Sequence, residues 1–236
     1  MPPRASCVDR NLFFLVHLKK LLTGGFGRKH YGQWAEDAIL EKLLPEKQGF
    51  FVDVGAYHPM HYSNTYLLYK RGWRGINIDP NPASILLFNV HRRGDTNLNY
   101  GVSERAGEAA YYRFNHQSCN TFSREQKDAL LRTKFIRFLG ETRIATLPLQ
   151  SILDEHAADK DIDLLNVDVE GMGLEVLRTL DWDRSAPRII CVEDEDLDLS
   201  KQAPYGSAIY TYLTERGYSL KSTVGLSSVY ARTKRT

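Results

Sequence analysis

Short apolar runs alternate along the chain with segments whose apolar residues recur at helical spacing. The apolar runs, rich in Val, Ile, Leu and Phe, cover residues 50–54, 74–79, 97–102, 162–167 and 188–193. Helical patterns follow them or lie between them at residues 63–71, 83–90, 149–156, 171–180 and 207–216. Strands that alternate with helices in this way predict a parallel, buried sheet and therefore an α/β fold.

The chain departs from this alternation in two places. Residues 218–222 and 227–231 are typical of a closing hairpin, which would add an antiparallel pair at the C-terminal end. Residues 117–141 are polar, charged and weakly patterned, and we expect a helix within them at 128–139. A long, weakly patterned insertion between core strands often carries function. We therefore expect residues 117–141 to form a lid or a substrate-recognition insertion.

Two helical segments precede the first strand. Apolar residues recur at helical spacing over residues 34–44 and stop at Pro45. Residues 12–22 are apolar but include two lysines and a histidine, so this segment is too short and too charged to span a bilayer. We expect it to pack on the domain rather than on a membrane surface or a partner. Residues 1–48 are thus interpreted as an N-terminal helical extension, and residues 49–236 as one domain.

Charge and cysteine content exclude several classes of protein. The net charge is +2, with 31 basic and 29 acidic residues, so no long basic stripe is available and nucleic acid is not an expected partner. Cys7, Cys119 and Cys191 are odd in number and far apart, which argues against a disulfide framework and a structural zinc site. We therefore expect a cytoplasmic protein.

Acidic residues and a glycine stand at the ends of the first two predicted strands. Gly55 follows Asp53 closely at the end of the first strand, and Asp79 ends the second, 26 residues after Asp53. Ligands of open α/β sheets bind beyond these strand ends, and a carboxylate on the second suits the two hydroxyls of a ribose. A helix cap before Pro80 is the alternative interpretation of Asp79. The pattern favours a ligand that contains adenosine.

The loop after the first strand lacks the glycines that cradle a pyrophosphate. Gly55 is followed by Ala56, Tyr57, His58 and Pro59, so neither G-x-G-x-x-G nor a P-loop is present. This disfavours a nicotinamide dinucleotide and favours a ligand with a sugar and a base but no phosphates.

Polar residues alternate at the end of the fourth core strand. Asn166, Asp168 and Glu170 lie on one side of an extended backbone, because side chains alternate with a period of two. We expect them to converge on one pocket, where they would bind a substrate hydroxyl, remove its proton or coordinate a metal. The alternative is that they cap a helix that begins near Gly171.

Histidines and further acids complete the candidate residues. His58 and His61 lie in the loop above the first strand, where an imidazole can act as a general base, although a structural role is the alternative for each. Residues 193–196 are four consecutive acids after the fifth strand. Metal binding is one interpretation of this cluster, and a solvated loop is the one we adopt.

Together these motifs resemble the FkbM-type S-adenosylmethionine-dependent methyltransferases over about residues 31–222. The matching segments are YGQWAED at 31–37, FVDVGAYHP at 51–59, YSNT at 62–65, KRGWRGINIDPNP at 70–82, NYGVS at 99–103 and IDLLNVDVEG at 162–171. The family's usual N-x-G after the first glycine is here Tyr57-His58-Pro59. The resemblance implies a Rossmann-like class I methyltransferase fold, with a mostly parallel seven-stranded sheet and an antiparallel C-terminal hairpin.

The resemblance also implies bound S-adenosylmethionine and the residues that contact it. Asp53 and Gly55 would lie near its amino acid part, and Asp79 on its ribose. Asn99, Gly101 and Ser103 would lie on the adenine side. The other matching positions expected at the cofactor are Gln33, Glu36, Ala56, Ser63, Asn64, Pro80 and Asp168.

Members of this family mostly methylate hydroxyl oxygens on sugars, polysaccharides or polyketide-type natural products, so we expect O-methylation of such an acceptor. The reaction needs an aligned acceptor and removal of its proton, for which His58, Asp168 and Glu170 are the candidates. A divalent cation such as Mg²⁺ held by the acids is the alternative. A non-catalytic nucleotide- or glycan-binding module on the same fold, and a dinucleotide-dependent dehydrogenase or epimerase, are the rival interpretations. The sequence leaves the acceptor and the oligomeric state open, a homodimer included.

Overall fold

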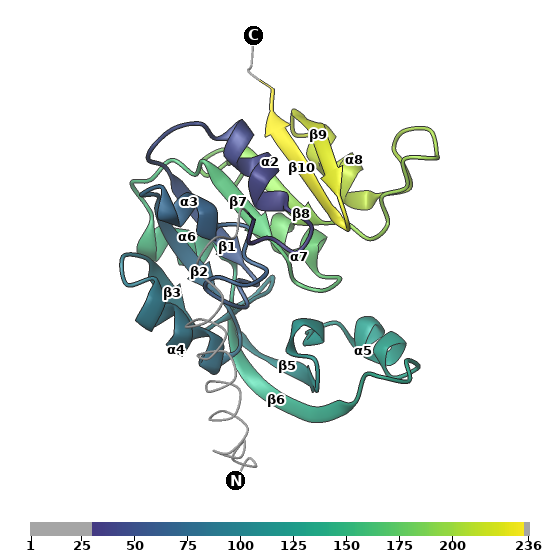
Figure 1. Ribbon diagram of the computed structural model, residues 1–236. Coiled ribbons are helices and arrows are strands. Elements are labelled where there is room, and N and C mark those ends of the chain that lie inside the picture. Colours follow the sequence, from purple (N-terminus) through teal and green to yellow (C-terminus); the bar gives the residue numbers. More distant parts are fainter. Residues whose placement is uncertain (1–29, 234–236) are drawn as a thin grey trace.

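A computed structural model describes residues 30–233, and a seven-stranded sheet forms its centre (Figure 1). The strands lie in the order β3-β2-β1-β7-β8-β10-β9. Their bounds are β1 Phe50–Val54, β2 Arg74–Ile78, β3 Thr96–Leu98, β7 Leu164–Val167, β8 Ile189–Glu193, β9 Tyr218–Val224 and β10 Ser227–Arg232. The strands from β3 to β8 are parallel, and β10 runs antiparallel to both β8 and β9. The expected α/β fold, a mostly parallel sheet with an antiparallel C-terminal hairpin, is confirmed.

Helices cover both faces of this sheet. They are α2 Glu36–Leu43, α3 Tyr66–Lys70, α4 Pro82–His91, α6 Leu149–His156, α7 Gly173–Arg178 and α8 Ala208–Thr214. Apolar residues of α6, α7 and α8 pack with Val52 and Ile76 on one face. Apolar residues of α2 and α3 pack with Phe51 and Leu164 on the other. Two covered faces explain why the core strands are continuous apolar runs.

Strand β1 carries one polar exception to this pattern. Val52 and Val54 point into the first core and Phe51 into the second, and Asp53 follows Phe51 on the same face with 1% of its surface exposed. A carboxylate buried in a sheet needs hydrogen-bonding partners. Asp53 therefore marks a place where the sheet is held by polar contacts.

A three-stranded sheet forms an insertion between the core strands and extends away from the main sheet (Figure 1). It contains β4 Gly101–Val102, β5 Gly107–Phe114 and β6 Phe138–Leu147, with the 3₁₀ helix η1 Gln117–Cys119 and helix α5 Arg124–Leu130 between β5 and β6. Strands β5 and β6 are antiparallel, and β4 pairs with β6 in parallel. The insertion is therefore larger than the segment 117–141 and is built on a strand pair.

Two predicted elements of this region are wrong. The strand expected at 97–102 is split, since Thr96–Leu98 pairs with β2 whereas Gly101–Val102 pairs with β6. The helix expected at 128–139 is instead Arg124–Leu130, because the Ser123 side chain caps it by accepting a hydrogen bond from the backbone N–H of Gln126.

The expected N-terminal helix at 12–22 lies outside the described residues. Within residues 30–233, no helix combines the length and apolar character needed to cross a membrane.

Candidate active site

A cavity of about 240 Å³ lies at the carboxyl ends of the parallel strands. The strand ends contribute Gly55 after β1, Asp79 after β2, Asp168 after β7 and Glu193 at the end of β8. The insertion contributes residues 117–122 to the same wall. The cavity thus occupies the position where ligands bind in open α/β sheets.

Seven of the expected site residues line this cavity, namely Gln33, Gly55, Asp79, Pro80, Gly101, Asp168 and Glu170. The others lie outside its wall, namely Glu36, Asp53, Ala56, His58, Ser63, Asn64, Asn99 and Ser103. The sequence motifs therefore contain both residues that face the cavity and residues that hold the surrounding loops.

Asp79 lies at the cavity with both carboxylate oxygens held in place. Its Oδ2 accepts a hydrogen bond of 2.7 Å from the backbone N–H of Tyr57, and its Oδ1 accepts one of 2.7 Å from Asn81. Each oxygen retains a further acceptor position. The cap of helix α4 is Asn81, whose side chain accepts from the N–H of Ala83, so the capping interpretation of Asp79 is not needed. Burial is the main cause that raises the pKa of Asp79 to about 6.

Gly55 lines the cavity and also allows a close approach of two strands. Its φ is +80°, and a Cβ atom there would lie 1.7 Å from the backbone oxygen of Asp168. The glycine is therefore required because the end of β1 passes close to the end of β7. This close approach brings the two strand ends together at one cavity wall.

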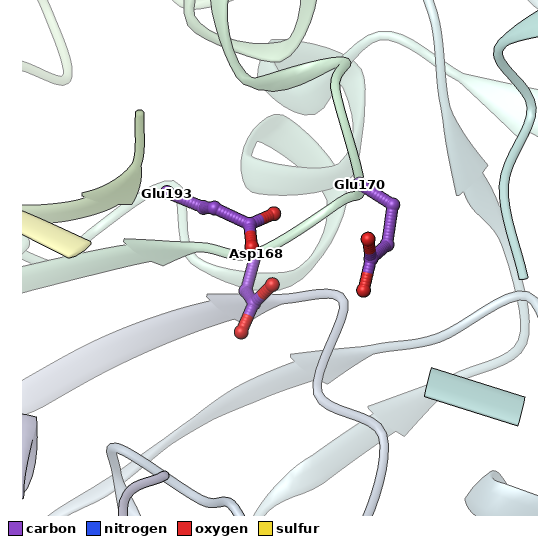
Figure 2. Close-up of side chains that lie close together, drawn as sticks. All are labelled: Asp168, Glu170 and Glu193. Carbon is purple, nitrogen blue, oxygen red and sulfur yellow. The ribbon is translucent and has the colours of Figure 1, made fainter. Parts of the chain in front are cut away.

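Three carboxylates meet beyond β7 and β8. Oxygen atoms of Asp168, Glu170 and Glu193 lie within 4.8 Å of one another, and Figure 2 shows their side chains converging from the two strand ends. Burial, and then repulsion from neighbouring acids, raises the pKa of Asp168 and of Glu193, and a hydrogen bond joins this pair. The same two causes raise the pKa of Glu170 to about 8. The cluster can accept a proton near neutral pH or hold a cation.

Two expectations about these acids are corrected. The strand ends at Val167 and Glu170 has a φ of 48°, so the two-residue alternation does not continue, and Asn166 does not join Asp168 and Glu170. Glu193 was expected in a solvated loop, but it is the last residue of β8 and lines the cavity. Ligands of open α/β sheets bind beyond the carboxyl ends of the strands, and we call this the strand-end rule. It identified Asp79 from the sequence, and it could have identified Glu193 as a site residue in the same way.

Asn166 belongs to a buried polar network that contains Asp53. Its Nδ2 donates to Oδ1 of Asp53 at 2.8 Å, and its Oδ1 accepts from Nδ2 of Asn64 at 3.0 Å. The hydroxyl of Thr65 donates to Oδ2 of Asp53 at 2.6 Å. Both oxygens of Asp53 are thus satisfied by protein groups, which places Asp53 and Asn64 behind the cavity wall.

Arg92, the residue after α4, holds the loop between β1 and α3. Its side chain is fully buried and donates to the backbone oxygen of Pro59 at 2.9 Å and to the hydroxyls of Ser63 at 2.7 Å and Thr65 at 2.8 Å. Ser63 therefore also has a structural contact. Because these side chains hold the loop, α3 begins at Tyr66 and not at the expected residue 63.

His58 is not placed to act as the general base. Its side chain is fully buried, and its Nδ1 accepts hydrogen bonds from the backbone N–H groups of Met60 at 3.1 Å and His61 at 3.0 Å. A base must reach the acceptor hydroxyl. Since neither His58 nor His61 lines the cavity, His58 is better described as a residue that shapes the loop.

The remaining expected positions also support loops. Glu36 accepts hydrogen bonds from the backbone of Trp34 at 2.8 Å and from Ser227 at 3.3 Å. Asn99 donates to the backbone oxygen of Asp79 at 2.9 Å. The hydroxyl of Ser103 donates a hydrogen bond to the backbone oxygen of Arg105. The backbone N–H of Ala56 donates one to the backbone oxygen of Ile78.

The insertion supplies aromatic cavity residues that the sequence did not identify. Phe122 packs against Tyr111 with ring centroids 4.7 Å apart, and both line the cavity. Gly101 permits this arrangement, because a Cβ atom there would lie 2.5 Å from the ring of Phe122. The hydroxyl of Thr121 donates to the backbone oxygen of Glu170 at 3.0 Å and so ties the insertion to the acids. No periodic pattern marks these residues.

Comparison with known proteins assigns the chain to a family. The sequence model described as "Methyltransferase FkbM domain" matches residues 53–220, which include the ends of β1, β2, β7 and β8 and the insertion. No curated protein matches the chain. The chain therefore belongs to the FkbM methyltransferase domain family, and its fold is that of a class I methyltransferase.

Proposed function

We propose that the protein transfers a methyl group from S-adenosylmethionine to a hydroxyl oxygen of a sugar, a glycan or a natural product. One observation carries this proposal: a fixed carboxylate, Asp79, and the three-carboxylate cluster Asp168, Glu170 and Glu193 line the same cavity of a methyltransferase fold. Asp79 suits the ribose hydroxyls of the donor, and the cluster suits an acceptor hydroxyl.

The residues around the cavity fit the methyl donor. Asp79 offers one further acceptor position on each oxygen for the ribose, and Gly101 lies on the side expected for adenine. Asp168 and Gly55 lie on the side expected for the amino acid part. When bound, S-adenosylmethionine supplies an electrophilic methyl group on a positively charged sulfur.

The backbone of the loop after β1 argues against a dinucleotide. The N–H groups of Gly55 and Ala56 both donate to the backbone oxygen of Ile78, at 3.0 and 3.1 Å. The N–H of Tyr57 donates to Asp79 and that of His58 to the backbone of Ala56. A pyrophosphate binds such loops through backbone N–H groups that point outward, and here they are used within the protein. This supports a donor without a pyrophosphate over NAD.

The acids supply the proton chemistry of the proposed reaction. The acceptor oxygen forms a bond to the methyl carbon while the carbon–sulfur bond breaks, and the proton of the hydroxyl passes to a carboxylate. In its ionised form Glu170 is the candidate acceptor of this proton, with Asp168 beside it, because a raised pKa makes its carboxylate a stronger base than an ordinary one. The neighbouring insertion, residues 117–122, would select the acceptor and close over it.

The same three carboxylates are also a suitable ligand set for a divalent cation, which would lower the pKa of the hydroxyl instead. Thermal unfolding with and without Mg²⁺ separates these two chemistries. A rise in Tm with Mg²⁺ in the wild type that is lost in Glu170→Gln would assign the cluster to a cation. An unchanged Tm in both proteins would assign it to proton transfer.

Calorimetry with S-adenosylmethionine and with NAD tests the donor. We expect micromolar affinity for the first and no binding of the second. Asp79→Asn is the informative variant, because it removes the charge but keeps one acceptor oxygen for the N–H groups of Tyr57 and Asn81, whereas alanine keeps none. Loss of the charged acceptor should weaken binding by roughly tenfold to a hundredfold. The exposed acid in Asp159→Asn serves as the matched control.

Two results would contradict this assignment of the donor: tighter binding of NAD, or unchanged affinity in Asp79→Asn. A non-catalytic module on the same fold is the second candidate. Such a module would bind the donor but release no S-adenosylhomocysteine with any sugar or glycan acceptor. Glu170→Gln would then leave the release of S-adenosylhomocysteine unchanged.

A further inference from the structure

The tip of the insertion, residues 130–139, exposes apolar side chains that the proposed reaction does not use. Phe135 is 86% exposed, Leu131 is 51% exposed and Leu139 is 48% exposed. Phe138, at 38%, anchors the base of the tip, where its ring lies 5.6 Å from that of Phe114. Apolar side chains gathered in this way on a surface indicate a binding site.

Cations alternate with these apolar residues. Arg132, Lys134 and Arg137 are all exposed, and residues 129–140 contain no Asp or Glu. Within residues 30–233, none of the three forms an ion pair. The tip is therefore both apolar and positively charged.

Hydrogen bonds fix the shape of the tip. The side chain of Asn115 accepts a hydrogen bond from the backbone N–H of Arg137 at 2.6 Å and donates one to the backbone oxygen of Phe135 at 3.3 Å. Thr133 donates from its hydroxyl to the backbone oxygen of Leu130 at 2.7 Å. The exposure of Phe135 is thus imposed by an ordered turn that extends away from the main sheet with β5, β6 and α5 (Figure 1).

We propose that residues 130–139 dock the protein on an anionic lipid bilayer surface, with Phe135, Leu131 and Leu139 entering the interface and Arg132, Lys134 and Arg137 meeting lipid phosphates. Apolar residues interleaved with cations are the combination that binds such surfaces. A symmetric contact with a second copy is disfavoured, because the three cations would then face the same three cations. The inference does not rest on methyl transfer.

Sedimentation of the full chain with vesicles tests the docking. The vesicles are phosphatidylcholine alone and phosphatidylcholine mixed with phosphatidylglycerol. We expect sedimentation only with the anionic vesicles, weakened by salt. Phe135→Ser should lower the partition coefficient roughly tenfold, and each of Arg132→Gln, Lys134→Gln and Arg137→Gln by about fivefold.

Matched controls remove exposed groups elsewhere on the protein. Leu199→Ser removes an apolar side chain that is 54% exposed, and Arg93→Gln removes an exposed cation. Neither should change sedimentation, and circular dichroism of all variants should match the wild type. The docking proposal is overturned by equal binding to neutral vesicles, by binding that the tip variants leave unchanged, or by no binding to any vesicle. It is also overturned if the tip variants instead dissociate a dimer in sedimentation velocity.

Discussion

Asn166 on β7 donates a hydrogen bond of 2.8 Å to Asp53 on β1, and both side chains are buried between neighbouring strands. The two residues are direct partners in the register of these strands. Asn166→Leu would leave one oxygen of Asp53 and the Nδ2 of Asn64 without partners. We expect the free energy of unfolding to fall by about 3 kcal/mol. Urea denaturation measures this loss.

Asn89→Leu is the control for that prediction, because it removes a hydrogen bond to Asn97 on the exposed surface. Its free energy of unfolding should change by no more than about 0.5 kcal/mol. Equal stability of the two variants would show that the buried bond contributes no more than an exposed one.

Gly55 and Gly171 give a matched pair of glycine substitutions. Their φ angles are +80° and +84°, but a Cβ at Gly55 meets the backbone of Asp168 at 1.7 Å, whereas nothing lies within 4 Å at Gly171. Gly171→Ala should cost only the strain of a left-handed backbone, about 1–2 kcal/mol. Gly55→Ala should cost about 3 kcal/mol more and weaken donor binding, because the ends of β1 and β7 must separate. Denaturation midpoints that coincide would refute the close approach.

The sequence predicts the core of this molecule well, because the signals for it are local. Buried strands are continuous apolar runs, and the strand-end rule locates Asp79 and Asp168 without knowledge of any contact. The same rule places Asp53 beside them. It cannot show that the order of the strands places Asn166 beside Asp53, or that Asn166 and Thr65 satisfy its carboxylate.

The insertion is harder to predict for a physical reason. Strand β6 is exposed or half-exposed along most of its length, so its sequence carries no apolar alternation that would distinguish it from a loop. The contacts that bring Phe122 to the cavity depend on Gly101, which precedes it by 21 residues. A glycine in the sequence does not show which residue packs against it, so this contact can be identified only once the fold is known.

Donor affinity should depend on pH through Asp79. Burial raises its pKa to about 6, so the carboxylate gains a proton as pH falls through that value. The protonated form is a poorer acceptor for the ribose hydroxyls. Calorimetry between about pH 5 and pH 7 should show affinity falling by up to about tenfold per pH unit below pH 6. The Asp79→Asn protein should show no such fall, and a fall of the same size in that variant would assign the titration to another group.

Glu170→Gln should separate catalysis from stability. Because the pKa of Glu170 in the folded protein is raised to about 8 from an ordinary value of 4.5, the folded state holds a proton that the unfolded state releases between these two values. The free energy of unfolding therefore decreases as pH rises through this window, by at most about 1.4 kcal/mol per pH unit. Glutamine cannot titrate, so the variant should gain Tm over the wild type as pH rises from about 5 to 8, while it binds the donor and loses methyl transfer. Parallel Tm profiles for the two proteins would show that Glu170 carries no raised pKa, and would remove the physical basis for its role as the proton acceptor.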